Sequence, residues 1–191
     1  MDISPGFSAF ASEYEKGRPQ AVFVRLVADL ETPVSVFLKL AEGKDNAFLL
    51  ESVQGGEARG RYSIIGFNPD LIWRCRDGKA EVQHADGFVS DKDSDAPLKS
   101  LRRHVEDARM ALPAGLPPMS VGLFGYLGYD MVRLMEELPA SHPDPIGIPD
   151  AILIRPMAYV TLTIDHRVVD GHQTNAWLTR FVEVIETWSS A

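Results

Sequence analysis

The chain has 191 residues, of which 45% are hydrophobic and 24% charged, a composition typical of a folded domain and not of a disordered or fibrous protein. With 19 Lys and Arg against 27 Asp and Glu, its net charge of −8 disfavours nucleic acid and anionic membrane surfaces as partners. Cys75 is the only cysteine, so no internal disulfide can form and a cysteine-based zinc site lacks ligands. Because the sequence shows no leader-like N-terminus and no apolar run of membrane length, we expect a cytoplasmic protein with no membrane contact.

The first elements predicted along the chain are a helix, a strand and a second helix. Apolar residues at helical spacing predict a helix over Ser4–Lys16, which ends near Gly17. The β-favouring run at residues 21–27 predicts a strand. Pro33 then favours the start of a short helix, which Gly43 ends.

Four β-rich runs follow and predict an antiparallel meander. They are Asn46–Val53, Arg61–Phe67, Leu71–Arg76 and Lys79–Gln83. Asp77 and Gly78 can adopt the positive φ angles of a two-residue type I′ turn, so the last two runs should form a hairpin. The polar stretch Asp86–Pro97 is expected to be an exposed connection.

The remainder of the chain alternates short helices and strands. The next helix should carry an apolar face made of Leu98, Leu101, Val105, Ala108 and Leu112. Ser120–Leu127 predicts a strand and Tyr129–Leu138 a short helix, after which four prolines favour an extended connection. Residues 151–165 are β-rich around Pro156, so they form either an edge strand or two strands that meet there. A last amphipathic helix is predicted over Trp177–Trp188.

Two neighbouring places in the sequence could bind a small polar ligand. The loop Gly55–Arg61 combines three glycines with two arginines, which suits an anion, but it lacks the Gly-Lys-Ser/Thr ending of a phosphate loop. A simple connection between strands is therefore favoured. At the end of the preceding strand, the Glu51 carboxylate could bind an ammonium group and the Ser52 hydroxyl a carboxylate, as recognition of an amino acid requires. A solvated strand end is the competing interpretation.

His166 is the residue best suited to proton transfer. It lies in the polar segment Asp165–Gly171 after a β-rich run, and histidine can take or give a proton near neutral pH. A single histidine in a turn is nevertheless more often structural or exposed, so both interpretations stand.

Five segments occur in order within residues 7–156: Thr32–Ser35, Phe48–Val53 with Gly56 and Glu57, Gly60–Gly66, Gly122–Asp130 and Pro149–Pro156. Together they resemble the N-terminal region of the large subunit of anthranilate synthase, component I. The resemblance implies an α+β fold, a largely antiparallel sheet layered with helices. It also implies a role in tryptophan biosynthesis, in the conversion of chorismate and glutamine-derived ammonia to anthranilate and pyruvate. In that family the Leu-Leu-Glu-Ser segment lies at the feedback site, so Ser52 and Glu51 would contact L-tryptophan.

The same resemblance implies what this chain lacks. The family's chorismate-binding half, which also binds Mg²⁺, follows the matching region, and we expect it to be absent here. We therefore expect no metal and no cofactor in this chain, and no catalysis by the chain alone. The implied partners are L-tryptophan as an effector and either the glutaminase subunit or the catalytic half of the enzyme.

Residues 155–191 resemble the C-terminus of a dihydrolipoamide acyltransferase from a 2-oxo acid dehydrogenase complex. The resemblance rests on the segment Arg155–Gly171 and the helix that follows. It implies that His166 is the general base that deprotonates coenzyme A and that Asp170 helps to order the site. We therefore expect two parts, 1–156 and 157–191, with the second packed on the first. A natural fusion, a truncated or recombined gene and an artificial joining all fit this pattern.

Three hypotheses follow from the sequence. The first is a regulatory, tryptophan-responsive part of anthranilate synthase component I. The second is an acyltransferase remnant that uses His166. The third is a non-catalytic interaction module without a small ligand, which exposes apolar surface that a missing half would cover.

Overall fold

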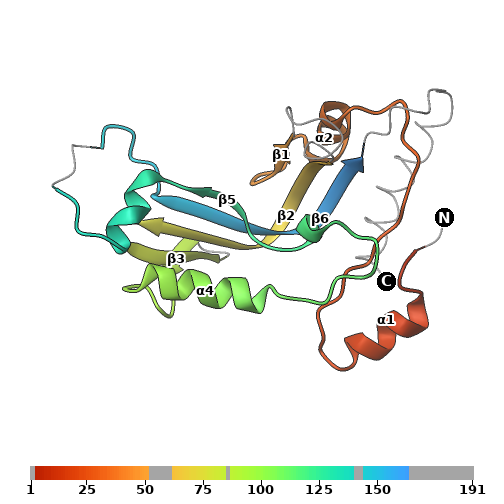
Figure 1. Cartoon of the computed structure of the whole chain (residues 1–191), viewed down its shortest axis with the longest axis horizontal. Coiled ribbons are helices and arrows are strands. Elements are labelled where there is room, and N and C mark those ends of the chain that lie inside the picture. The colour runs from red at the N-terminus through yellow and green to blue at the C-terminus, as the bar shows by residue number, and fades with distance from the viewer. Residues whose placement is uncertain (1–2, 52–61, 85–86, 140–143, 164–191) are drawn as a thin grey trace. The chain divides into compact units, whose positions relative to one another are not determined.

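The structure is a computed structural model that describes residues 3–51, 62–84, 87–139 and 144–163, and it confirms the α+β prediction (Figure 1). Its sheet has six strands in the order β4-β3-β2-β6-β5, with β1 paired to β2. The pairs with a recorded register are all antiparallel. The elements are α1 (Phe7–Tyr14), α2 (Pro33–Ala41), β1 (Phe48–Leu50), β2 (Tyr62–Arg76), β3 (Lys79–His84), β4 (Gly87–Ser90), α4 (Pro97–Asp107), η1 (Pro118–Ser120), β5 (Phe124–Leu127), η2 (Tyr129–Leu134) and β6 (Ala151–Thr163).

The chain divides into two compact units. The first comprises Met1–Phe67 and Tyr159–Ala191, and the second comprises Asn68–Ala158. Strands β2 and β6 each contribute residues to both units. The boundary expected at residues 156/157 from the two family resemblances falls inside β6 and stays a prediction.

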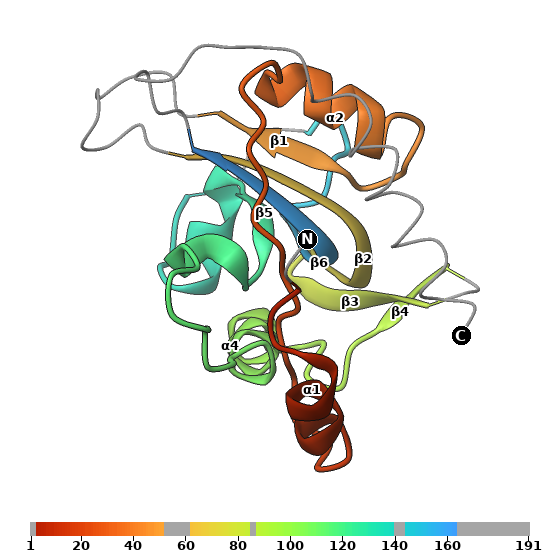
Figure 2. The same ribbon diagram turned by 90° about the vertical axis from the view of Figure 1, so that its right-hand side faces the viewer.

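Helix α2 and strand β1 pack together in the first unit, and Figure 2 shows them side by side. Thr32 caps the helix: its Oγ1 accepts from the Ser35 backbone N–H at 3.0 Å, while Ser35 Oγ accepts from the Thr32 N–H at 2.9 Å. This capping box and Pro33 in the first turn explain why the helix begins here. Its buried face consists of Pro33, Val36, Leu40 and Ala41.

The N-terminal part of the first unit contains less regular structure than the sequence predicts. Helix α1 forms within the predicted range, but none of its residues is buried. The strand predicted at residues 21–27 is wrong, because only Phe23 makes a bridge, to Ser4. A β-favouring composition is not sufficient for a strand, which needs a ladder of backbone partners.

The second unit is built around a β-hairpin and a buried aromatic residue. Asp77 and Gly78 have φ angles of 50° and 69°, which confirms the two-residue turn between Arg76 and Lys79. The core cluster combines three residues of the hairpin strands, Trp73, Cys75 and Ala80, with Met131 and Ala151.

Strand β5 approaches β6 so closely that a glycine is required between them. Gly125 has a φ of +156°, and a Cβ atom placed there would lie 1.9 Å from the Ile152 carbonyl oxygen. Gly128 is also close, because its N–H donates to the Asp150 carbonyl at 2.7 Å. The glycine spacing of this segment therefore serves close backbone packing.

Several predicted boundaries differ from the structure. Within the described residues, the runs predicted at Arg61–Phe67 and Leu71–Arg76 are continuous in one strand, β2 (Tyr62–Arg76), although Asn68 between them has a φ of 50°. Residues 151–163 likewise form one strand, with Pro156 beyond the last pair to β5. The helix expected over Tyr129–Leu138 is instead the six-residue 3₁₀ helix η2.

The region around α4 contains two further corrections. Residues 87–90 of the expected exposed connection form strand β4, paired to β3. Helix α4 ends at Asp107, and its buried residues are Pro97, Ser100 and His104, whereas Val105 is exposed. Leu98 and Leu101 of the predicted apolar face pack against the core cluster as expected, while the polar residues Ser100 and His104 are buried as well.

Candidate functional site

The sequence analysis names four candidate site residues, and the structure describes one of them. Glu51 lies one position beyond β1, and its side chain is exposed. Ser52, His166 and Asp170 lie outside the described residues. Neither the proposed tryptophan contact of Glu51 nor the acyltransferase pair is tested by the structure.

The surroundings of Glu51 are fixed by β1 and its neighbours. Leu50 is paired with Ile64 of β2, and the Leu50 side chain is about half exposed, at 51%. Helix α2 packs against the same short strand. A carboxylate therefore lies at the exposed end of a strand that is held on two sides.

A second acidic residue of the first unit is buried at the start of α2. The Glu31 side chain is only 4% exposed and pairs with the ammonium group of Lys39. It also accepts a hydrogen bond of 2.5 Å from the Ser35 hydroxyl. Burial raises the pKa of Glu31, but the hydrogen bonds from Lys39 and Ser35 lower it, and the net pKa is below its ordinary value.

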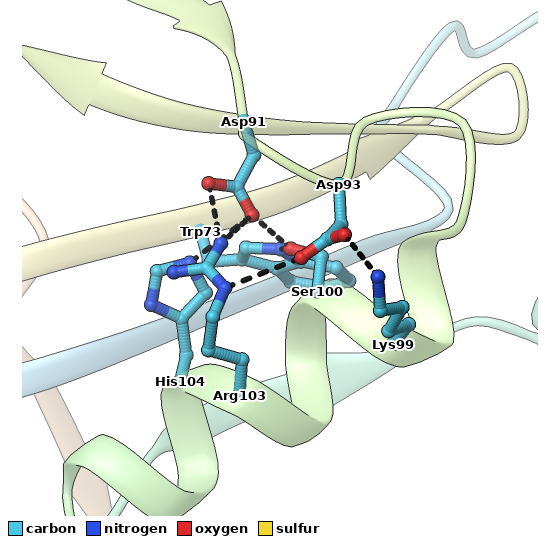
Figure 3. Close-up of polar contacts among 7 residues, drawn as sticks. All are labelled: Trp73, Asp91, Asp93, Lys99, Ser100, Arg103 and His104. Atoms are coloured by element: carbon cyan, nitrogen blue, oxygen red, sulfur yellow. Dashed lines mark hydrogen bonds and ion pairs between the residues drawn. The ribbon is translucent and has the colours of Figure 1, made fainter.

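The most extensive polar arrangement in the described residues joins β4 and α4 in the second unit, and we call it the Asp91 cluster (Figure 3). The Asp91 carboxylate is 6% exposed and accepts a hydrogen bond from the Ser100 hydroxyl. Arg103 Nη2 donates to both of its oxygens, at 2.8 and 2.6 Å. His104 Nε2 lies 3.3 Å from the same carboxylate. Trp73 Nε1 donates to Ser100 Oγ at 2.8 Å, which connects the cluster to the buried core.

Asp93 forms the exposed side of the same arrangement. Lys99 donates to its carboxylate at 2.6 Å, and Arg103 Nε at 3.4 Å, so Arg103 bridges Asp91 and Asp93. Residues 99, 100, 103 and 104 lie on successive turns of α4, which is why one helix face supplies all these donors.

The electrostatics of the cluster favour an ionised Asp91. Burial of the carboxyl raises its pKa, but hydrogen bonds from Ser100, the Lys92 backbone and Arg103, with the charge of Arg103, lower the pKa to about 2. An ionised carboxylate only accepts hydrogen bonds, so we assign the proton of His104 to Nε2.

The chemistry available to the Asp91 cluster is structural. The Ser100 hydroxyl donates to Asp91 and accepts from Trp73, but a carboxylate whose pKa is lowered to about 2 is too weak a base to activate it as a nucleophile. The Asp91 cluster therefore joins β4 to α4 and provides no catalytic pair.

Other kinds of site were sought in the same ranges. Among the described residues, no three His, Cys, Asp or Glu side chains converge as metal ligands. Within these ranges no helix is long and apolar enough to cross a membrane. An open hollow is lined by residues 133–138, but one continuous segment forms it, without polar groups converging from other elements.

Sequence reasoning missed the Asp91 cluster because it treated charged residues as solvated. A usable signal was present, since Lys99, Ser100, Arg103 and His104 recur at helical spacing shortly after two aspartates. Trp73, which connects Ser100 to the core, lies 27 residues before it and outside the reach of this local pattern.

Comparison with known proteins gives a consistent result for most of the chain. Anthranilate synthase component I of Cereibacter sphaeroides is 48% identical over 159 residues, which are 82% of this chain and 32% of that protein. Over most of its length, this chain is similar to anthranilate synthase component I. The corresponding protein of Synechocystis is 35% identical over 184 residues, 95% of this chain and 34% of its own length. The chain thus spans about a third of the relatives that it matches.

Two further matches concern a solved structure and the C-terminal part of the chain. The crystal structure of anthranilate synthase component I from Streptococcus pneumoniae matches 86% of this chain and 37% of its own, with 22% identity and a TM-score of 0.47. The family model of the 2-oxoacid dehydrogenases acyltransferase (catalytic domain) matches residues 138–191. The match to the Synechocystis protein covers 95% of this chain, so it extends past Pro156 and overlaps the acyltransferase match.

Proposed function

We propose that this chain is the N-terminal, tryptophan-sensing part of anthranilate synthase component I. The observation that carries the proposal is the 48% identity to the Cereibacter sphaeroides enzyme over 82% of the chain. The exposed position of Glu51 at the end of β1 agrees with a role in binding a small ligand. The proposed role belongs to tryptophan biosynthesis, as feedback control of anthranilate formation.

In this proposal the ligand is L-tryptophan, and two adjacent residues bind its amino-acid group. The Glu51 carboxylate holds the ammonium group, and the Ser52 hydroxyl donates to the carboxylate. Conversion of chorismate, its Mg²⁺ requirement and the ammonia supply from a glutaminase partner belong to the rest of the longer enzyme.

The test is a titration of the ¹⁵N-labelled chain with L-tryptophan, followed by amide-resolved NMR. We expect shifts concentrated at residues 48–51, and a Glu51→Gln variant should weaken binding about tenfold, because a charge-assisted hydrogen bond contributes roughly 1.5–3 kcal/mol. Glu42→Gln removes another exposed carboxylate of the same unit and is the control. No response to tryptophan, or equal affinities for Glu51→Gln and the parent chain, would refute the proposal.

A second candidate function is supported by the acyltransferase match over residues 138–191. In this alternative His166 is the base that takes the proton of the coenzyme A thiol, and Asp170 orders the site. Titration with coenzyme A should then shift amides near residue 166, and a His166→Ala variant should lose acyl transfer from S-acyldihydrolipoamide to the coenzyme A thiol, in which dihydrolipoamide leaves as the thiol. A chain that does not respond to coenzyme A excludes this alternative.

A further inference from the structure

We infer that Glu31 is a positioning residue for the tryptophan site. By holding the first two turns of α2 it fixes this helix against β1, and through β1 it fixes the place of Glu51. The inference rests on the function proposed above, and it assigns to Glu31 a role in ligand affinity without any contact to the ligand.

The clamp at Glu31 joins three positions along one face of α2. Glu31 precedes the N-cap, and its carboxylate accepts from the hydroxyl of Ser35 at 2.5 Å and from the ammonium group of Lys39. These partners lie four and eight residues further along the chain, so the clamp extends over two turns. Ser35 also completes the capping box with Thr32. One buried carboxylate therefore connects the cap to the last turn of the helix.

Helix α2 depends on such a clamp because it is short. It has nine residues, and a helix of this length is marginal in water without caps and tertiary packing. Two of its buried residues, Val36 and Leu40, directly follow Ser35 and Lys39, the two residues that Glu31 holds. Loss of the clamp frees the first turn, and the packing of the buried face then loosens.

The position of β1 follows from that of α2. The strand has only three residues and pairs with β2 through Phe48 to Gly66, Leu49 to Ile65 and Leu50 to Ile64. So short a strand has few backbone partners of its own, and α2 is the helix that packs against it. A change in α2 is therefore transmitted to Leu50 and to Glu51, the next residue.

The chain offers a matched control on another helix. Glu13 pairs with Lys16 at 2.6 Å and with Arg18 at 2.8 Å, so it is also an acidic residue with a lysine partner in the first unit. It lies on α1, however, which has no buried residue, and its side chain is 36% exposed. Removing the charge of Glu13 thus breaks comparable ion pairs without disturbing α2.

The experiment compares tryptophan affinity of the 191-residue chain with that of Glu31→Gln and Glu13→Gln, at a temperature where circular dichroism shows all three folded. We expect Glu31→Gln to weaken binding about fivefold to tenfold, up to about 1.4 kcal/mol. Glu13→Gln should change it less than about twofold. Amide exchange at Leu49 and Leu50 in the ligand-free protein should become faster in Glu31→Gln alone.

Substitutions at Lys39 distinguish positioning from a general loss of stability and replace Glu31→Gln if that variant does not fold. Lys39→Arg keeps the cation and should retain the parent affinity, whereas Lys39→Met should weaken binding as Glu31→Gln does. Parent-like affinity in folded Glu31→Gln or Lys39→Met overturns the inference. A parent chain that binds no tryptophan refutes the proposed function, and the inference with it.

Discussion

Substitution of Asp91 by asparagine should destabilise the protein in a pH-dependent way. The side chain keeps its shape but loses the charge that accepts from Ser100 and Arg103. Folding lowers the pKa of this carboxyl from 3.8 to about 2. Because each pKa unit corresponds to roughly 1.4 kcal/mol, the ionised carboxylate contributes about 2 kcal/mol at neutral pH.

The sign of the pH dependence follows from the lowered pKa. Below its folded-state pKa the group is protonated in both states, so its contribution is present above about pH 4 and is lost as the pH falls towards 2. An asparagine side chain cannot ionise, so the difference between the parent and Asp91→Asn in free energy of unfolding should be about 2 kcal/mol at about pH 7. It should shrink towards zero near the folded-state pKa of about 2.

Urea unfolding followed by circular dichroism at several pH values measures this difference. Asp95→Asn is the control, because Asp95 is 91% exposed in the same connection and its ion pair with Lys79 is 3.9 Å long. We expect the control to change stability by less than about 0.5 kcal/mol. An Asp91→Asn effect that is equal at neutral and strongly acidic pH, or no larger than that of Asp95→Asn, would show that the charge of Asp91 does not stabilise the fold.

Two other predictions concern the backbone approach of β5 and the single thiol. Gly125→Ala should destabilise the protein by more than about 2 kcal/mol in the same urea assay, because its Cβ would meet the Ile152 carbonyl oxygen at 1.9 Å. Gly43→Ala is the control and should cost about 1–2 kcal/mol, because Gly43 has a positive φ but lies in open space. Equal effects of the two substitutions would contradict the close approach of β5 to β6. Burial raises the pKa of the Cys75 thiol to about 11. This thiol should therefore react with Ellman's reagent only after the chain unfolds. Rapid reaction of the native chain would show that the thiol is accessible.

Local signals in the sequence predicted the elements that depend on local interactions. The helix that begins at Pro33 and the hairpin at Asp77 and Gly78 are specified by a cap and by a turn, whose partners lie within a few residues. The antiparallel pairing of β1 with β2 and of β2 with β3 agrees with the predicted meander, although two of its four runs form the single strand β2. These parts were predictable because the interactions that decide them lie within a short stretch of chain.

The features that sequence reasoning missed depend on residues far apart in the chain. Residues 21–27 have the composition of a strand but find only the bridge from Phe23 to Ser4. Asp91 has the appearance of a solvated loop residue, yet α4 supplies its partners and Trp73 of β2 completes the arrangement. Glu51 of the candidate ligand site lies at the end of β1, as expected. Its role in binding tryptophan stays a prediction.

The neighbours of β2 are made at very different times during synthesis. Its hairpin partner β3 follows after two residues, but β6 supplies Arg155, which pairs with Asp70 across 85 positions of the chain. At about 5–20 residues per second, a ribosome needs roughly 4–17 s to make the intervening chain. During that interval one side of β2 has no native partner, so the nascent chain carries an open strand edge on which a chaperone or another nascent chain can act.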